Sequence, residues 1–257
     1  MTTPTTIPWA NIRALTLDIY GTLVDWDSGV VRAAHATPLS PHIRAAGSDA
    51  DFLRAIEAQH ARIEREQPGM RKSEINAEGF RAYAREIGVV VDGEVEEAAR
   101  GFGRSIGGFE AFGDTVDAIK RLSKHFEVIV PLTNMDHFSY GGTLAGPLKG
   151  CPFTASYLAE DIGSYKPDLA NFRYLFDHLK ADYGIEKNEI CHVAQSLFHD
   201  HGPAKKVGLR SVWVDRYGIL EAEGRRWEDV QGEYGMVGRV SSLAELADLV
   251  DEALGGS

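Results

Sequence analysis

The segment Asp18-Ile19-Tyr20-Gly21-Thr22 holds residues whose types and spacing could do chemistry. A carboxylate can attack an electrophilic carbon or phosphorus, and a nearby hydroxyl with backbone N–H groups can fix one carboxylate oxygen. Gly21 lets the chain turn away sharply, and Thr22 supplies the hydroxyl. We therefore predict that Asp18 is a nucleophile, while a simple turn after a strand is the alternative.

The residues before Asp18 form the element that would position it. The run Ala14-Leu15-Thr16-Leu17 is apolar enough for a strand buried on both faces. Asp18 would then lie at the carboxyl end of this strand, where open parallel sheets place their ligands.

The segment resembles the first motif of the haloacid dehalogenase superfamily, whose phosphatases read Asp-x-Asp-Gly-Thr. Here Tyr20 replaces the second aspartate. The phosphatases use that aspartate to protonate a leaving alkoxide, and a tyrosine with a pKa of about 10 is a poor donor at neutral pH. A halide leaves without a proton. The motif with Tyr20 therefore resembles that of the 2-haloacid dehalogenase branch and favours carbon–halogen cleavage.

Thr133-Asn134 follows the predicted strand 127–130 and resembles the Ser/Thr-Asn of the second motif, although a plain turn explains the pair equally well. A hydroxyl and an amide at a strand end can both donate hydrogen bonds to an anion. The resemblance implies that Asn134 helps to hold the halide, and we assign Thr133 to the substrate carboxylate.

Ser164-Tyr165-Lys166-Pro167-Asp168 matches the third motif. The Lys-Pro pair places a lysine just ahead of a helix, with proline in the first turn. The ammonium of Lys166 can keep the Asp18 carboxylate ionised and orient it, while a solvated lysine is the alternative. The dehalogenases commonly have a tyrosine six residues later, where this chain has Phe172.

The fourth motif region runs from Val193 to Asp200 and resembles the phosphatase stretch Gly-Asp-Ser-Leu-x-x-Asp, with Gln195 in place of the first aspartate. A neutral amide is a poor substitute for a carboxylate in a magnesium site, so we expect magnesium to be dispensable and predict no cofactor. In the dehalogenases an aspartate here positions the water that hydrolyses the ester, and Asp200 fits that role. Gln195 and Ser196 match the other two dehalogenase residues imperfectly, and the spacing is one residue longer.

His199 occupies the place of an aromatic residue that lies against the halide in the dehalogenases. The triplet His199-Asp200-His201 also suggests a metal site, but adjacent side chains on a helix point in different directions, so we predict no metal ligands. In the helical region, Leu53-Arg54 resembles the aromatic-arginine pair that brings a cation to the halide. Arg54 is our choice among several arginines; its rivals are Arg62, Arg65 and Arg71.

The rest of the chain predicts the elements that would hold these residues. Residues 27–111 carry helical periodicity, with helices expected at 51–63, 74–87 and 94–106 and no convincing strand. Strands at 127–130, 190–193 and 211–214 then alternate with helices at 114–124, after 167, at 200–207 and at 242–254. We predict an α/β protein: a Rossmann-like parallel-sheet core of residues 1–26 and 112–257, with a helical cap of residues 27–111 inserted after the first strand. The resemblance implies the same layout.

The composition limits the classes of partner. The 257 residues are 44% hydrophobic, which suffices for a sizeable core, and 38 acidic against 27 basic residues disfavour nucleic acid and anionic membranes. Two cysteines are too few for a disulfide framework, and the sequence has neither a secretory leader pattern nor a membrane-spanning run. We expect a cytoplasmic protein with a small anionic organic substrate. The family's tendency to dimerise implies a homodimer.

Our preferred hypothesis is the hydrolytic dehalogenation of short 2-haloacids. Asp18 attacks C2, Arg54 and Asn134 receive the halide, and a water near Asp200 cleaves the ester. Three alternatives stay open: a hydrolase of this superfamily that opens another activated carbon centre, a phosphatase, and a non-catalytic binding protein with the same fold. Magnesium dependence would identify the phosphatase, and the presence of Asp18, Lys166 and Asp200 argues against the binding protein.

Overall fold

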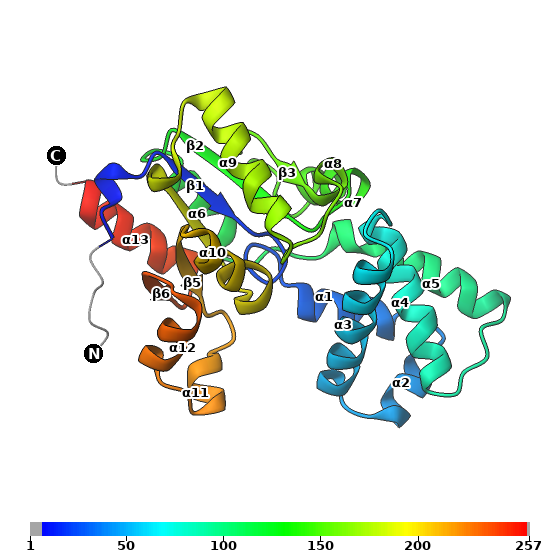
Figure 1. Ribbon diagram of the computed structural model, residues 1–257. Helices are drawn as coiled ribbons and strands as arrows, with labels where there is room; N and C mark the ends of the chain where they lie inside the picture. Colours follow the sequence, from blue (N-terminus) through cyan, green and yellow to red (C-terminus); the bar gives the residue numbers. More distant parts are fainter. Residues whose placement is uncertain (1–6, 256–257) are drawn as a thin grey trace.

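A six-stranded parallel sheet forms the centre of the structure, a computed structural model that describes residues 7–255 (Figure 1). The strand order is β3-β2-β1-β4-β5-β6, which confirms the predicted parallel α/β class. The strands are β1 (Ala14–Leu17), β2 (Val128–Thr133), β3 (Tyr157–Leu158), β4 (Ile190–Ala194), β5 (Arg210–Val214) and β6 (Gly238–Val240).

Strand β1 lies at the point where the strand order reverses, because it pairs with β2 on one side and with β4 on the other. All four of its residues are buried, as the apolar run predicted. Open α/β sheets bind ligands in the crevice at the carboxyl end of the strands, at such a reversal point. The fold therefore places the residues that follow β1 in that crevice.

Strand β2 continues through Pro131, beyond the end that we predicted at residue 130. Backbone N–H groups alternate along a strand: Val128 donates towards β1, and Ile129 donates to Thr154 on the β3 side. Pro131 turns its nitrogen to the β3 side, where pairing begins one residue later, so the sheet loses no hydrogen bond. The longer strand carries Thr133 to the edge that holds the crevice.

The helices of the core cover both faces of the sheet, with α9 and α13 on opposite sides of the strands (Figure 1). Because side chains alternate along a strand, Leu15 and Leu17 pack on the α13 side, whereas Ala14 packs on the α9 side. These helices are α6 (Thr115–Leu122), α7 (His137–Ala145), α8 (Ala159–Ile162), α9 (Leu169–Tyr183), α10 (Gly202–Val207), α11 (Ile219–Glu223), α12 (Trp227–Tyr234) and α13 (Leu243–Leu254).

The segment between β1 and α6 is helical, as its periodicity predicted, and Figure 1 shows its helices grouped beyond the carboxyl end of β1. Apolar side chains of this segment and of the sheet face form one continuous cluster. The division into a core and a cap at residues 26/27 and 111/112 stays a prediction. The helices are α1 (Trp26–His35), α2 (Ser40–Ala46), α3 (Asp49–Glu66), α4 (Lys72–Glu86) and α5 (Gly93–Ser105).

Some elements have no counterpart in the prediction. Strands β3 and β6 span only two and three residues, which is too short for an alternating pattern to stand out in the sequence. Helices α1, α2, α7, α8, α11 and α12 were not predicted either, and most of them are short. None of the described helices combines the length and the apolar character that crossing a membrane requires.

Candidate active site

A cavity of about 700 Å³ lies where the carboxyl ends of the central strands face the helical segment. It brings together all but one of the predicted site residues, and the remaining one, Thr22, bonds directly to Asp18. The predicted residues that line the cavity are Asp18, Tyr20, Arg54, Thr133, Asn134, Lys166, Gln195, Ser196, His199 and Asp200.

The ammonium of Lys166 is the centre of the site. It is buried, with 1% of its side chain exposed, and donates to Asp18 Oδ1 at 2.7 Å and to Asp200 Oδ1 at 2.6 Å. Its third hydrogen bond, of 2.9 Å, goes to the carbonyl of Leu132 at the end of β2. All three N–H groups of the ammonium are used, so Lys166 holds the two carboxylates in fixed positions.

The two carboxylates differ in acidity. Burial raises the pKa of Asp18, and the neighbouring charge of Asp200 raises it further, while Lys166 opposes both effects. Burial also disfavours the charged form of Asp200, but Lys166 and a hydrogen bond from His192 outweigh it and lower the pKa of Asp200. Asp200 therefore stays ionised to lower pH than Asp18, and a proton entering the site goes first to Asp18.

The turn after β1 fixes the second oxygen of Asp18. The Thr22 hydroxyl donates to Asp18 Oδ2 at 3.2 Å and accepts the backbone N–H of Gln195 at 2.9 Å. Gly21 has a φ of +79°, and a Cβ atom there would lie 3.1 Å from the Gln195 side-chain oxygen. The turn thus requires glycine for both its backbone angle and its contact with the fourth motif.

Asn134 and Thr133, at the end of β2, have different surroundings. The Asn134 amide accepts the backbone N–H of Lys166 at 2.7 Å and donates to its carbonyl at 3.0 Å. Asn134 therefore fixes the backbone of the lysine and keeps one amide N–H for a ligand. The Thr133 hydroxyl is buried without a hydrogen-bond partner among the described residues, which leaves it free for an anion.

The prediction that Pro167 lies in the first turn of a helix is wrong. Helix α9 begins at Leu169, and the Asp168 carboxylate accepts the backbone N–H of Ala170 at 2.8 Å as the N-cap. The Lys166–Pro167 peptide bond is cis. Because α9 begins at Leu169, Lys166 lies in the loop before the helix, where Asn134 holds its backbone.

The fourth motif contains a π-helical turn, Leu197–His201, where we had predicted the start of an α-helix at Asp200. Ser196 caps this turn: its hydroxyl accepts the backbone N–H of His199 at 3.1 Å, and its carbonyl accepts that of His201 at 3.3 Å. A π-helical turn accommodates one more residue than an α-helical turn. Asp200 reaches Lys166 from this turn, so the longer spacing noted in the sequence does not keep the carboxylate out of the site.

Two cations of the helical segment, Arg54 and Lys72, line the cavity. The Arg54 side chain is 70% exposed and pairs with Asp51 at 2.5 Å. Lys72 is only 8% exposed, also lines the cavity, and donates to Glu64 Oε1 at 2.5 Å. Lys72 is therefore the buried cation that this segment presents to the cavity, and it was not among the residues predicted from the sequence.

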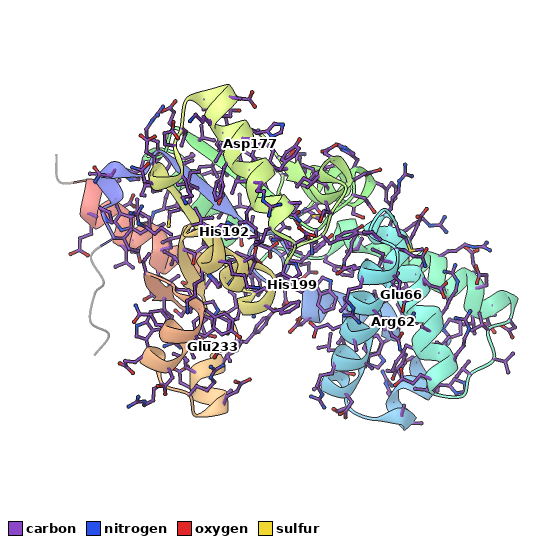
Figure 2. The ribbon with its side chains drawn as sticks, viewed as in Figure 1. Arg62, Glu66, Asp177, His192, His199 and Glu233 are labelled. Carbon is purple, nitrogen blue, oxygen red and sulfur yellow. The ribbon has the colours of Figure 1, made fainter. Side chains whose placement is uncertain are left out.

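The charges of two ion pairs, Lys166–Asp200 and Lys72–Glu64, act on His199. Burial lowers its pKa, and the ammonium groups of Lys166 and Lys72 act in the same direction, against Asp200 and Glu64. The ring is therefore neutral at pH 7, and its Nδ1 lies 3.1 Å from the Ser196 hydroxyl. Figure 2 shows His199 on the side of the core that faces the helical segment.

The oxygen donors near Asp18 do not suit a magnesium ion. Burial raises the pKa of Tyr20 well above its ordinary value, and its hydroxyl donates to the Ile106 carbonyl at 3.3 Å. Gln195 offers a neutral amide, and the Lys166 ammonium already pairs with one oxygen of Asp18 and one of Asp200. Across residues 7–255, no group of three or more His, Cys, Asp or Glu side chains is arranged to hold a metal ion.

Comparisons with known proteins identify the family of the chain and proteins of similar fold. The chain is 24% identical over 213 residues to (S)-2-haloacid dehalogenase 4A of Burkholderia cepacia, with 81% of this chain and 85% of the relative covered. A crystal structure of a dehalogenase with an intermediate complex superposes with a TM-score of 0.74 at 20% identity, covering 93% of this chain and 97% of that one.

A second solved structure is the L-2-haloacid dehalogenase of Xanthobacter autotrophicus with chloropropionic acid covalently bound. It superposes with a TM-score of 0.71 at 15% identity and covers 93% of this chain and 98% of that one. The family model of the haloacid dehalogenase-like hydrolases matches residues 12–208, which is most of the chain. The protein therefore belongs to the haloacid dehalogenase-like hydrolase family.

Proposed function

We propose that this hydrolase cleaves the carbon–halogen bond of 2-haloacids through an ester of Asp18. The observation that carries the proposal is a buried carboxylate, fixed by Lys166, in a site where neutral Tyr20 replaces the acid that an alkoxide leaving group requires. A nucleophile without a partner acid suits a leaving group that departs as a stable anion. The dehalogenase relatives support the same chemistry.

In the first half-reaction, a carboxylate oxygen of Asp18 attacks C2 of the substrate. A carbon–oxygen bond forms as the carbon–halogen bond breaks, and the halide leaves with the bonding electron pair. His199 and Asn134 both line the cavity, and in this proposal the His199 ring and the remaining N–H of Asn134 receive the halide. The free hydroxyl of Thr133 is available to the substrate carboxylate.

In the second half-reaction, water attacks the carbonyl carbon of the Asp18 ester. Asp200 takes the proton from this water, the acyl carbon–oxygen bond breaks, and the departing alkoxide takes a proton to give a 2-hydroxy acid. Asp18 returns as a carboxylate, and the net reaction releases one halide and one proton. The low pKa of Asp200 keeps it ionised and able to start this step.

A halide-release assay tests the proposal. Chloroacetate, bromoacetate, fluoroacetate and 2-chloropropionate should include a substrate. EDTA should leave the rate almost unchanged, because Tyr20 and Gln195 are neutral at the positions where the phosphatases have aspartates. Cleavage of phosphate monoesters that collapses on chelation and returns with magnesium would assign the protein to the phosphatases instead. Halide release that depends on magnesium would contradict the metal-free mechanism.

The helical side supplies a second prediction, on substrate binding. Lys72 should hold the substrate in the cavity, whereas Arg54 should contribute little, because its side chain is 70% exposed and water screens the charge of an exposed guanidinium. The double variant Glu64→Gln/Lys72→Met removes the buried pair without leaving one charge unpaired. It should raise KM about 10- to 100-fold, the loss expected for a hydrogen bond to a charged group.

The matched control is Arg54→Met, which should change KM by less than about twofold. Melting curves of both variants separate binding from loss of fold. A large KM effect in Arg54→Met, with none in the double variant, would return the role to Arg54.

A further inference from the structure

His192 lies beneath the site, on β4, and contacts the active-site carboxylate from the sheet side. Its Nε2 lies 2.9 Å from Asp200 Oδ1, and its Nδ1 lies 2.8 Å from the hydroxyl of Thr16 on β1. Thr16 and His192 are opposite each other in the pairing of the two strands, and both are fully buried. Figure 2 shows His192 among the strands of the core, away from the helical segment.

The hydrogen bond between His192 and Asp200 fixes the position of the proton that they share. Asp200 is ionised, because its pKa is lowered, and an ionised carboxylate only accepts hydrogen bonds. Nε2 of His192 must therefore carry the proton that it shares with Asp200. Nδ1 makes the other hydrogen bond of the ring, with the Thr16 hydroxyl, and this second contact fixes the orientation of the ring.

The two oxygens of Asp200 are unequal as a result. Oδ1 accepts from both Lys166 and His192, whereas Oδ2 is buried without a hydrogen-bond partner among the described residues. A buried carboxylate oxygen without a partner is unfavourable unless a donor occupies the site in the working enzyme. Asp200 is among the residues that line the cavity, so we infer that a water molecule from the cavity pairs with the buried Oδ2 in the working enzyme.

We propose that His192, oriented by Thr16, is a positioning residue for the hydrolytic half-reaction. It holds Oδ1 of Asp200 so that Oδ2 stays free to accept the proton of the attacking water. This role rests on the proposed ester mechanism and adds to it a pair of strand residues that never touch the substrate. Lys166 also donates to Oδ1, but it holds Asp18 as well. His192 bonds to Asp200 and not to Asp18, and Thr16 acts on Asp200 through His192.

A purely structural histidine would have a different signature. The ring of His192 packs edge-on against Phe172, with ring centroids 5.8 Å apart, so its replacement also disturbs the core. Loss of packing lowers stability and affects both half-reactions through the same disordered site. Loss of positioning slows ester hydrolysis selectively, because the attack of Asp18 on the substrate does not use Asp200 Oδ2.

The test measures the two half-reactions separately in three variants. His192→Leu removes both ring nitrogens, His192→Gln keeps an N–H donor, and Thr16→Val removes the hydroxyl that orients the ring. With the best 2-haloacid of the release assay, rapid-quench samples give the rate of halide release in a single turnover. Mass spectrometry of the peptide that contains Asp18 gives the rate at which the ester disappears.

The expected result is a selective effect. His192→Leu should slow ester disappearance about 10- to 100-fold, as for a lost hydrogen bond to a charged group, while halide release changes little. Thr16→Val should show a smaller effect of the same kind, and His192→Gln should recover most of the rate. Melting temperatures report the stability of each variant. If His192→Gln recovers the rate of ester disappearance although its melting temperature is as low as that of His192→Leu, this result would also support positioning.

Two results would overturn the role of His192 but leave the proposed function intact. One is equal slowing of both half-reactions in His192→Leu and His192→Gln, and the other is normal ester disappearance in folded His192→Leu. Absence of both halide release and an Asp18 adduct in the wild-type protein would instead overturn the proposed function, and the role of His192 with it.

Discussion

Replacing Asp18 by asparagine should reduce halide release by at least about 10,000-fold, because an amide oxygen cannot form the ester that the mechanism requires. The fold should survive the change. The carbonyl oxygen of the new amide can still accept a hydrogen bond from Lys166, and Lys166 keeps its charge partner Asp200. Steady-state halide release and a melting curve of the same sample measure both parts of this expectation.

Asp177→Asn is the matched control for this variant. Asp177 lies on an exposed face of α9, far from the helical segment in Figure 2, and undergoes the same chemical change. Its activity should equal that of the wild-type protein. Appreciable turnover by Asp18→Asn, after mass spectrometry has excluded deamidation back to aspartate, would remove the covalent mechanism.

Replacing Asp200 by asparagine should stop the reaction at the ester. An amide cannot take the proton of the attacking water, and loss of a general base typically slows such a step by about 100- to 10,000-fold. Formation of the ester should be much less affected, because Lys166 still orients Asp18. The peptide that contains Asp18 should therefore gain the mass of the substrate without its halogen.

Two outcomes would contradict this assignment of Asp200. In one, the variant consumes substrate at the normal rate; in the other, halide release itself stops and no adduct forms. Either would show that Asp200 does not act selectively in the second step. The water would then have to be held by another residue of the fourth motif region.

The sequence was informative where one chemical requirement dominates a position. The run at residues 14–17 predicts β1 with its observed bounds, because a strand buried on both faces must be apolar throughout. Asp18 and Lys166 lie 148 residues apart in the sequence, yet Lys166 Nζ lies 2.7 Å from Asp18 Oδ1. Their meeting follows from the parallel sheet, since segments that follow neighbouring strands converge at the same edge.

Local geometry explains where the prediction failed. A proline usually ends a central strand, but Pro131 is tolerated because its nitrogen faces a side of β2 that is unpaired at that point. The extra residue of the fourth motif is visible in the sequence, but whether it enters a loop or a π-helical turn depends on the packing of Asp200 beneath it.

The polar partners of the site were the least predictable. Lys72 of α4 and Glu64 of α3 form a buried pair, and nothing in their local sequence separates them from exposed charges. His192 lies within an apolar run, and the sequence alone is equally compatible with a core residue that has no role in the site. Only the pairing of β1 with β4 shows that Thr16 and Asp200 are its neighbours.

The most direct test of the Asp18 ester is a single turnover of the wild-type enzyme, in excess over a 2-haloacid, in water enriched in heavy oxygen. The account predicts that the heavy oxygen enters the Asp18 carboxylate, because water attacks the carbonyl carbon of the ester, and that the hydroxyl of the product carries ordinary oxygen from Asp18. Mass spectrometry of the Asp18 peptide and of the product reads both positions. Heavy oxygen in the product hydroxyl, with none in Asp18, would show direct attack by water on the substrate and would contradict the account.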